Sequence, residues 1–297
     1  MKRIFHIFLV LAISILGIPF SACDKVDDPY PTINEIDSSL VWDDSVEATP
    51  NNGVRFILME EFTGFRCPNC PEGAERVEDL IADYGDRFIA VAIHAQDEFA
   101  KPIAESGPYS NDYRTEDGNI YNETFQIASL PAGMVSRIQR SPGNYSMGRN
   151  LWRNFTEDII ANPGVTLGDI NIKNLYDDSS RTMETRVSFT WLEDNVTSNY
   201  NLQLYLLEND IIDWQIDNRK DPSDIENYVH KHLFRGSLNT TWGHEISFEG
   251  VGTTVELDPI QKQIPDGWKT EDLVVVAFVY DSDTYEVKQA NEAHITP

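Results

Sequence analysis

The sequence predicts an α/β domain followed by an all-β antiparallel domain, and three patterns carry this prediction. Two continuous apolar segments, residues 54–62 and 87–95, flank an amphipathic helical pattern, as in parallel βαβ units. From residue 165 onwards, apolar residues recur at every second position, as in half-buried strands. Hydrophobic residues make up 41% of the chain, enough to build packed cores rather than a disordered polymer.

In the first domain, the helical pattern lies between the two apolar strands. Its apolar positions are spaced i, i+3, i+4 and i+7, and they are Val77, Leu80, Ile81 and Tyr84. Gly85 follows directly, and glycine is the residue that most often ends a helix. The segment 54–85 and the strand after it therefore form one predicted βαβ unit.

A long polar insertion, residues 96–126, separates this unit from the rest of the domain, and it contains Tyr109, Tyr113 and Tyr121. We expect it to cap or flank the cysteine-containing face, either as a substrate lid or as a plain surface excursion with one short helix. An amphipathic helix over residues 151–160 is stopped by Asn162-Pro163-Gly164, which sets the predicted domain boundary at residue 164.

The second domain, residues 165–297, is predicted to be an antiparallel sandwich of the Ig-like or jelly-roll-like kind. One strand face carries Met183, Thr185, Val187, Phe189 and Trp191, and another carries Leu202, Leu204 and Leu206. With the apolar segment 273–280 and its return after a turn, we expect about six or seven strands. Residues 213–248 do not fit this pattern and are interpreted as an elaborated connection.

The charge balance excludes one class of partner. Forty-nine Asp and Glu residues face 23 Lys and Arg residues, which gives a net charge of -26. Nucleic-acid binding depends on cations that neutralise phosphates, so we expect no nucleic-acid partner. The sequence also contains no Gly-rich phosphate loop, no nucleophilic serine motif and no internal repeat, and we expect no cofactor.

The pattern of the first 50 residues predicts segments for export and membrane anchoring. Lys2 and Arg3 precede an apolar run over residues 4–20, the pattern of a secretory signal peptide covering residues 1–22. The segment Phe20-Ser21-Ala22-Cys23 resembles the lipobox of bacterial lipoproteins, which implies a lipid on Cys23 and hence a membrane partner. Residues 23–50 are rich in Asp and Glu and lack a helical or strand period, so we expect an acidic tether.

The other two cysteines form a Cys67-Pro68-Asn69-Cys70 motif between the first strand and the helix. In a βαβ unit this motif is typical of a thioredoxin-like redox site. A thiolate is stabilised at a helix N-terminus, so Cys67, next to Arg66, is the predicted nucleophile and Cys70 the resolving thiol of a Cys67–Cys70 disulfide. Two alternatives stay open, namely half of a zinc site and a static structural disulfide.

Two stretches resemble thioredoxin-fold proteins. Residues 61–67 match the family segment that runs from a buried acid to the first cysteine, and Glu61 falls at the carboxylate that exchanges a proton with the resolving thiol. Residues 127–135 resemble the family loop whose cis-proline faces the disulfide, which implies that role for Pro131. The resemblance gives the full fold prediction of an α/β thioredoxin-like domain followed by an antiparallel sandwich.

Histidines in the second domain are weak metal candidates. His230 and His232 would share one face of a strand, and His244 follows within fifteen residues. No pattern of supporting hydrogen-bond partners accompanies them. We therefore favour ordinary histidines over a metal site.

The lipobox, residues 61–71, Leu130-Pro131 and the segment from residue 228 to 243 together resemble the twenty-eight-kilodalton outer-membrane lipoprotein family of Bacteroidota. This resemblance implies an outer-membrane lipoprotein that faces the periplasm or the cell surface. Two functions remain open: thiol–disulfide exchange on exported protein substrates, or non-enzymatic surface binding or adhesion with a structural Cys67–Cys70 disulfide. No pattern predicts an oligomeric state.

Overall fold

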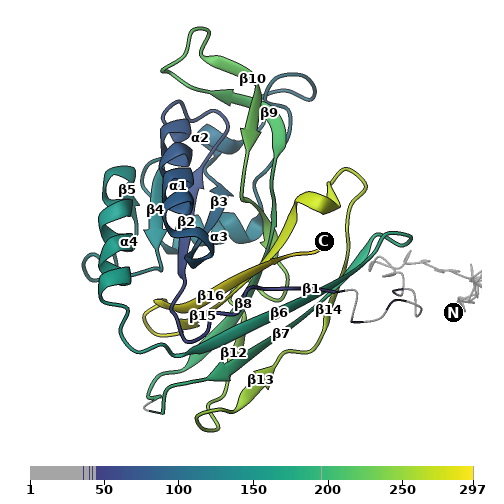
Figure 1. Cartoon of the computed structure of the whole chain (residues 1–297). Helices are drawn as coiled ribbons and strands as arrows, with labels where there is room; N and C mark the ends of the chain where they lie inside the picture. Colours follow the sequence, from purple (N-terminus) through teal and green to yellow (C-terminus); the bar gives the residue numbers. More distant parts are fainter. Residues whose placement is uncertain (1–35, 37–39, 41, 43–44, 195, 297) are drawn as a thin grey trace, which may run out of the picture. The chain divides into compact units, whose positions relative to one another are not determined.

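The computed structural model describes residues 36, 40, 42, 45–194 and 196–296, and these form mostly β-structure with a few helices (Figure 1). The strands are β1 (Val46–Glu47), β2 (Ile57–Thr63), β3 (Phe88–His94), β4 (Ala132–Val135), β5 (Met147–Gly148), β6 (Gly168–Asp177), β7 (Thr182–Trp191), β8 (Tyr200–Glu208), β9 (Ile211–Ile216), β10 (Asp224–His230), β11 (Leu233–Ser237), β12 (His244–Ile246), β13 (Thr254–Glu256), β14 (Ile260–Gln263), β15 (Leu273–Asp281) and β16 (Val287–His294). The helices are α1 (Cys70–Tyr84), α2 (Asp97–Ala100), α3 (Glu116–Thr124) and α4 (Trp152–Ala161), with 3₁₀ turns η2 (Gly85–Arg87), η3 (Arg149–Leu151) and η4 (Thr270–Asp272).

The predicted βαβ unit is confirmed. Strands β2 and β3 pair in parallel, and α1 connects them. Gly85 follows α1 with a φ of 55°, a left-handed conformation that glycine adopts at no steric cost. Strand β4 then pairs antiparallel with β2, and α4 lies on the same side of the sheet as α1 (Figure 1).

One sheet runs through both halves of the chain. In the described residues its order is β16-β15-β8-β11-β3-β2-β4-β5, with β12 also paired to β8. Strand β11 makes the junction: Leu233 is the parallel partner of Ala92 in β3, and the same strand pairs antiparallel with β8. The sequence predicts two separate domains, with residues 213–248 as an elaborated connection in the second. Strand β11 comes from that segment, and it covers an edge of β3 whose backbone groups would otherwise be unpaired.

A second antiparallel sheet packs face to face against the C-terminal strands. Its order is β1-β6-β7-β13, with β14 also paired to β7. Apolar side chains from β6 and β7 meet those from β8, β15 and β16 in one core, which includes Phe189, Trp191, Leu204 and Val275. Strand β1 lies inside the predicted tether of residues 23–50 but pairs with β6, so the prediction is wrong for Val46 and Glu47.

Strands in the large sheet are buried on both faces, which explains their continuous apolar sequences. In β15 the odd-numbered residues from 273 to 279 enter the core shared with the second sheet. The even-numbered residues from 274 to 280 enter another core beneath α3. Strand β2 alternates in the same way, so that Ile57 and Met59 face α1 and α4 while Leu58 and Phe62 face the α3 side.

A buried ion pair lies in the α3-side core. Arg137, directly after β4, donates from Nε and Nη2 to the two carboxylate oxygens of Glu60 in β2, both at 2.7 Å. The Arg137 and Glu60 side chains are 1% and 0% exposed. Tyr205 of β8 joins them, accepting from Arg137 at 2.9 Å and donating to Glu60 at 3.2 Å. Burial alone would lower the pKa of Arg137, but the Glu60 carboxylate outweighs it and the pKa is raised.

Aromatic rings enclose the guanidinium of Arg137. Its central carbon lies 5.0 Å to 5.7 Å from four ring centroids, those of Tyr121, Phe125, Phe278 and Tyr280. These rings come from α3, the residue after it, and β15, so the cation contacts both halves of the chain. Because a buried charge is tolerated only when it is paired, this cluster requires the two halves to assemble in one arrangement.

Replacing Arg137 by Met leaves the Glu60 carboxylate buried without its cation. We expect the free energy of unfolding to fall by about 3–5 kcal/mol in urea denaturation. The double variant Glu60→Met, Arg137→Met removes both charges and should lose less than Arg137→Met alone. Lys173→Ala, which breaks the exposed pair with Glu47, is the control and should cost less than about 1 kcal/mol. Equal losses in the single and double variants would contradict this account.

Candidate active site

The two cysteines of the predicted motif form a disulfide where β2 leads into α1. Cys67 lies in the connecting loop and Cys70 is the first residue of the helix, with a Cα–Cα distance of 5.4 Å. The loop is held by the backbone N–H of Cys67, which donates to the Gly64 carbonyl at 2.9 Å. Gly64 must lack a side chain, because a Cβ there would lie 2.7 Å from the Phe99 carbonyl oxygen.

Both cysteines are buried, at 1% exposure for Cys67 and 2% for Cys70. The β9–β10 hairpin of the second half covers the two cysteines. No sequence pattern predicted that this segment lies near the motif. Gln215 donates from Nε2 to the Cys67 carbonyl at 3.1 Å, and the Asn218 backbone N–H donates to the Pro68 carbonyl at 3.2 Å. The predicted outer cysteine is therefore enclosed.

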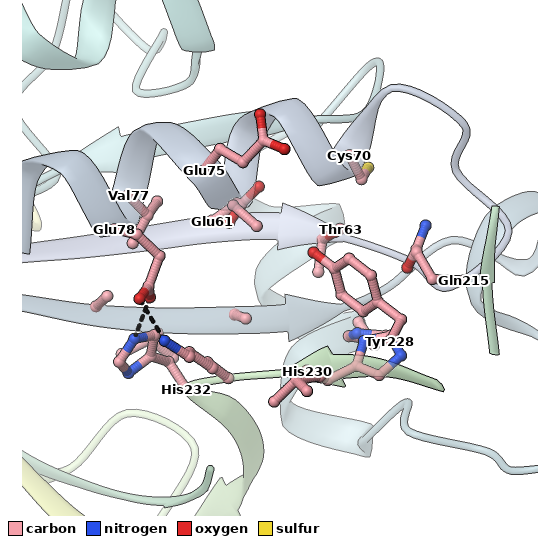
Figure 2. Close-up of a pocket in the computed structure, with 17 residues that line it drawn as sticks. Glu61, Thr63, Cys70, Glu75, Val77, Glu78, Gln215, Tyr228, His230 and His232 are labelled. Atoms are coloured by element: carbon pink, nitrogen blue, oxygen red, sulfur yellow. Dashed lines mark hydrogen bonds and ion pairs between the residues drawn. The ribbon is translucent and has the colours of Figure 1, made fainter. Parts of the chain in front are cut away.

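Behind Cys70 lies a cavity of about 280 Å³ (Figure 2). Residues of β2, β3, α1 and the hairpin with its following turn line it, among them Glu61, His94, Tyr228 and His230. It is the space that α1, the sheet and the hairpin leave between them. The predicted residues Glu61 and Cys70 thus share one cavity.

Glu61 is buried without a cation beside it. Its neighbour Glu60 points to the opposite face of β2, where Arg137 lies, whereas Oε1 of Glu61 has no hydrogen-bond partner. Burial raises the pKa of Glu61 from 4.5 to about 8. The side chain is therefore largely protonated at neutral pH and can give a proton to a thiolate. Gly73 makes room for it, since a Cβ at that position would lie 2.5 Å from Oε1.

Two histidines lie side by side at the cavity. The rings of His94 and His230 are 5.6 Å apart between centroids and nearly perpendicular. Burial lowers the pKa of His230 to about 4, and burial followed by the nearby His230 lowers that of His94 well below its ordinary value. Both imidazoles are therefore neutral at neutral pH. Nδ1 of His94 has no hydrogen-bond partner.

Pro131 begins the turn into β4, and the Leu130–Pro131 peptide bond is cis. A Cβ on Gly73 would lie 3.1 Å from the Cβ of Pro131, so the proline lies beside the first turns of α1. It lines a different cavity from the one behind Cys70.

The three candidate metal histidines have separate partners. Strand β10 ends at His230, and His232 follows with a φ of 54°, so the expected shared strand face was wrong. Nε2 of His230 lies 3.3 Å from the Trp214 carbonyl, whereas Nε2 of His232 lies 3.1 Å from Glu78. His244 is exposed on β12, paired with Leu202 of β8. In the described part of the chain, no group of three His, Cys, Asp or Glu residues is arranged to hold a metal.

The polar insertion of residues 96–126 reaches the site, as expected. Tyr109 stacks on Phe65 at 5.7 Å between ring centroids, and its hydroxyl donates to Asp224 of the hairpin at 2.7 Å. Tyr113 donates to Asp213 at 2.6 Å. The insertion therefore supports the hairpin from the side opposite α1. Its tyrosines were a usable sequence signal, whereas nothing in the sequence near Gln215 or Gly73 indicated their contacts.

The family model for the outer membrane protein Omp28 matches residues 118–297, more than half of the chain. The chain belongs to this family. Membership locates it at the outer membrane of the cell envelope. In the residues that the structure describes, no helix is long and apolar enough to span a membrane. The signal peptide and Cys23 lie outside those residues.

Solved structures of low sequence identity resemble this Omp28 family member. HBP35 of Porphyromonas gingivalis has 18% sequence identity with this chain, and the match covers 81% of this chain and 75% of HBP35. The TM-score of 0.62 shows that the two folds are similar. A domain of the outer membrane lipoprotein Omp28 of the same organism has 25% identity over 43% of this chain and 94% of its own, with a TM-score of 0.31. A protein from Agrobacterium tumefaciens has 9% sequence identity with this chain. The match covers 81% of this chain and 94% of the Agrobacterium chain, with a TM-score of 0.48. No curated protein matches the sequence.

The raised pKa of Glu61 predicts a pH-dependent stability. The folded chain holds a proton that the unfolded chain releases between pH 4.5 and about 8. The free energy of unfolding should therefore fall as the pH rises through this window, by about 1.4 kcal/mol per pH unit from this group. Glu61→Gln is neutral at every pH, so its stability relative to wild type should rise with this slope in urea titrations from pH 5 to 8.

Glu72→Gln is the matched control for Glu61→Gln. Hydrogen bonds from Arg149 and Arg76 lower the pKa of Glu72 to about 2, so it is ionised throughout the tested range in both states. Its difference from wild type should therefore not change between pH 5 and 8. If the difference in free energy of unfolding between Glu61→Gln and wild type also stayed constant from pH 5 to 8, Glu61 would be ionised in the folded protein.

Proposed function

We propose that this Omp28 family member is a lipid-anchored thiol–disulfide exchange protein of the outer membrane. The observation that carries the proposal is the shared cavity of Glu61 and Cys70, which is lined both by a buried acid and by the cysteine at the start of a helix. Its substrates are cysteines of exported proteins. The enzymatic assignment, as a thiol–disulfide oxidoreductase, rests on Cys67, Cys70, Glu61 and Pro131.

The exchange has two balanced steps. A substrate thiolate attacks the sulfur of Cys67, the Cys67–Cys70 bond breaks, and Cys70 leaves as a thiolate that takes the proton of Glu61. A second substrate thiolate then attacks the substrate sulfur of the mixed disulfide and releases Cys67 as a thiolate, which takes a proton from water. The substrate dithiol is oxidised to a disulfide, and the Cys67–Cys70 disulfide is reduced to two thiols. Reduction of a substrate disulfide follows the same steps in reverse.

The fold supports a thioredoxin-like module joined to a β-sandwich. The parallel β2–α1–β3 unit, the antiparallel β4 after Pro131 and helix α4 have the order that a thioredoxin-like module requires. The two sheets packed around Phe189 and Leu204 have the layered form of a sandwich. We assign residues 51–164 to the first module and residues 165–297 to the second, with strand β11 joining their sheets.

The anchor in this proposal is a lipid on Cys23, after removal of residues 1–22. The lipobox pattern and family membership support it. The acidic tether before β1 links the lipid to the folded part, which faces the periplasm or the cell surface.

The non-enzymatic alternative has one observation in its favour. Both cysteines are at most 2% exposed, as expected for a structural disulfide in a surface binding or adhesion protein. In that function the C-terminal sheets form the recognition surface. The redox behaviour of the disulfide distinguishes the two functions.

For the exchange function, we expect a reversible Cys67–Cys70 couple with a potential above about -300 mV, measured against glutathione or dithiothreitol buffers. Cys67→Ser should abolish insulin reduction, and Cys70→Ser should accumulate the mixed disulfide. Glu61→Gln should slow exchange at neutral pH by about 100-fold while the fold is retained. A couple below about -300 mV, with insulin reduction unaffected by Cys67→Ser, would support the structural disulfide instead.

For the anchor, Cys23→Ala should move the protein from the membrane fraction to the soluble fraction, because no acyl chain can then be attached. Cell fractionation with immunoblotting measures this, and labelling with a radioactive fatty acid should be lost in parallel. Cys67→Ser is the control and should stay in the membrane fraction. Retention of Cys23→Ala in membranes would refute this anchor.

A further inference from the structure

The β9–β10 hairpin is a separate two-stranded sheet that covers the disulfide. In the described residues, its strands pair with each other and with no strand of the two larger sheets. Figure 1 shows it extending beside α1, away from the C-terminal strands. A two-stranded hairpin is only marginally stable by itself, so its position depends on what it contacts.

Its contacts with the cysteine loop are hydrogen bonds, together with one apolar cluster in which Ile211, Trp214 and Ile216 pack around Phe65. The backbone N–H of Ile216 donates to the Phe65 carbonyl at 2.9 Å, and Gln215 and Asn218 donate to the carbonyls of Cys67 and Pro68. The hairpin thus binds the loop backbone in the manner of an added strand. Carbonyls released by opening can bind water or another extended chain.

Ion pairs hold the hairpin and the turn after it to helix α1. Arg219, at the hairpin tip, donates to both carboxylate oxygens of Glu75 at 2.6 and 2.7 Å. Just beyond the hairpin, Lys231 and His232 contact Glu78 at 2.5 and 3.1 Å, as the dashed lines in Figure 2 show. These carboxylates are a third or more exposed, so each pair contributes little and is screened by salt.

The inner side of the hairpin is not closely packed near Cys70. The cavity of about 280 Å³ lies there, bounded by Gln215, Tyr228 and His230 on the hairpin side. Unfilled space forfeits dispersion contacts, so opening the hairpin breaks few apolar contacts at this place. The hairpin is therefore held on the α1 side by weak polar contacts above a cavity and on the other side by the apolar cluster around Phe65. This uneven packing allows local opening on the α1 side, with the apolar cluster as the fixed side.

We propose that the β9–β10 hairpin is a gate that controls access of thiols to the Cys67–Cys70 disulfide, with the Arg219–Glu75 ion pair as its outer latch. This regulation rests on the proposed exchange function. When the hairpin is closed, Cys67 cannot be attacked. When it opens, the sulfur and the loop carbonyls are exposed together, so a substrate strand replaces the hairpin on the loop.

The test is the rate at which dithiothreitol reduces the disulfide of the full-length chain in detergent, measured by acid quenching, alkylation and mass spectrometry. The reagent dithiol closes to its cyclic disulfide, and two electrons and two protons pass to Cys67 and Cys70. Glu75→Gln and Arg219→Gln each break the latch, and each should accelerate reduction by about threefold.

Opposite charge changes separate gating from simple electrostatics. Glu75→Gln removes a negative charge and Arg219→Gln removes a positive one, so an electrostatic effect on the attacking thiolate changes the rate in opposite directions. Glu72→Gln and Arg149→Gln are the matched controls, because that pair joins α1 to the 3₁₀ turn η3 at 2.7 Å and involves no hairpin residue. Their rates should differ from that of wild type only by the electrostatic effect, which has opposite signs in the two control variants.

Each outcome bears on the gate. Acceleration in both latch variants supports it, whereas unchanged rates, or opposite effects of Glu75→Gln and Arg219→Gln, overturn it. The proposed function is read separately, from the redox potential and insulin reduction of the same proteins. An active exchange protein with unchanged latch variants refutes only the gate, and accelerated latch variants with a potential below about -300 mV refute only the exchange function.

Discussion

The buried pair of Glu60 and Arg137 is the constraint on which the arrangement of both halves depends. Two charges at most 1% exposed lose their hydration, and only close pairing offsets that loss. Their other partners are Tyr205 of β8 and the aromatic rings of α3 and β15, which are distant in sequence. The pair is satisfied only when β2 lies in the same sheet as β8 and β15. Apolar residues of similar size would fill the core equally well, so we interpret the pair as a determinant of arrangement more than of stability.

Two adjacent residues of β2, Glu60 and Glu61, carry carboxyl groups that lie in different environments. Successive side chains in β2 point to opposite faces, so Glu60 meets Arg137 while Glu61 meets the cavity behind Cys70. One carboxylate has a cation, and the other has none and holds its proton because burial raises its pKa. Adjacent acids of one type therefore differ in charge state, one being paired with a cation and the other neutral. The joined sheet positions both, since β11 brings the hairpin over the face on which Glu61 lies.

The sequence predicted the parts whose signals are local. Strand β2, helix α1 and strand β3 follow from continuous apolar runs and a helical period, and the position of Cys67 and Cys70 relative to them follows directly. Strand β11 was not predicted, because its partner in β3 lies more than a hundred residues away. The hairpin was not predicted, because β10 is exposed at most positions and shows no alternation. Burial of Cys67 had no local signal either, since the contact that covers it comes from Gln215. His230 and His232 were candidate metal ligands because they would share a face if both lay on one strand. Strand β10 ends at His230, and the chain turns at His232, so the two side chains lie at the end of the hairpin with different partners.

Closure of the hairpin is linked to the proton state of what it covers. Glu61 is protonated in the closed structure, and hydration on opening lets it ionise, so a higher pH favours opening through this residue. His94 and His230 are neutral when closed, and hydration lets them take up protons, so a lower pH favours opening through them. The facing charges include Glu75 and Glu78 at the rim, which are paired with Arg219, Lys231 and His232. Arg235 also acts on His94, whose pKa it lowers, and Asp213 acts on His230, whose pKa it raises. The free-energy cost of closing the hairpin is therefore lowest at intermediate pH. Closing removes water from the cavity, and this favours the neutral forms of Glu61, His94 and His230.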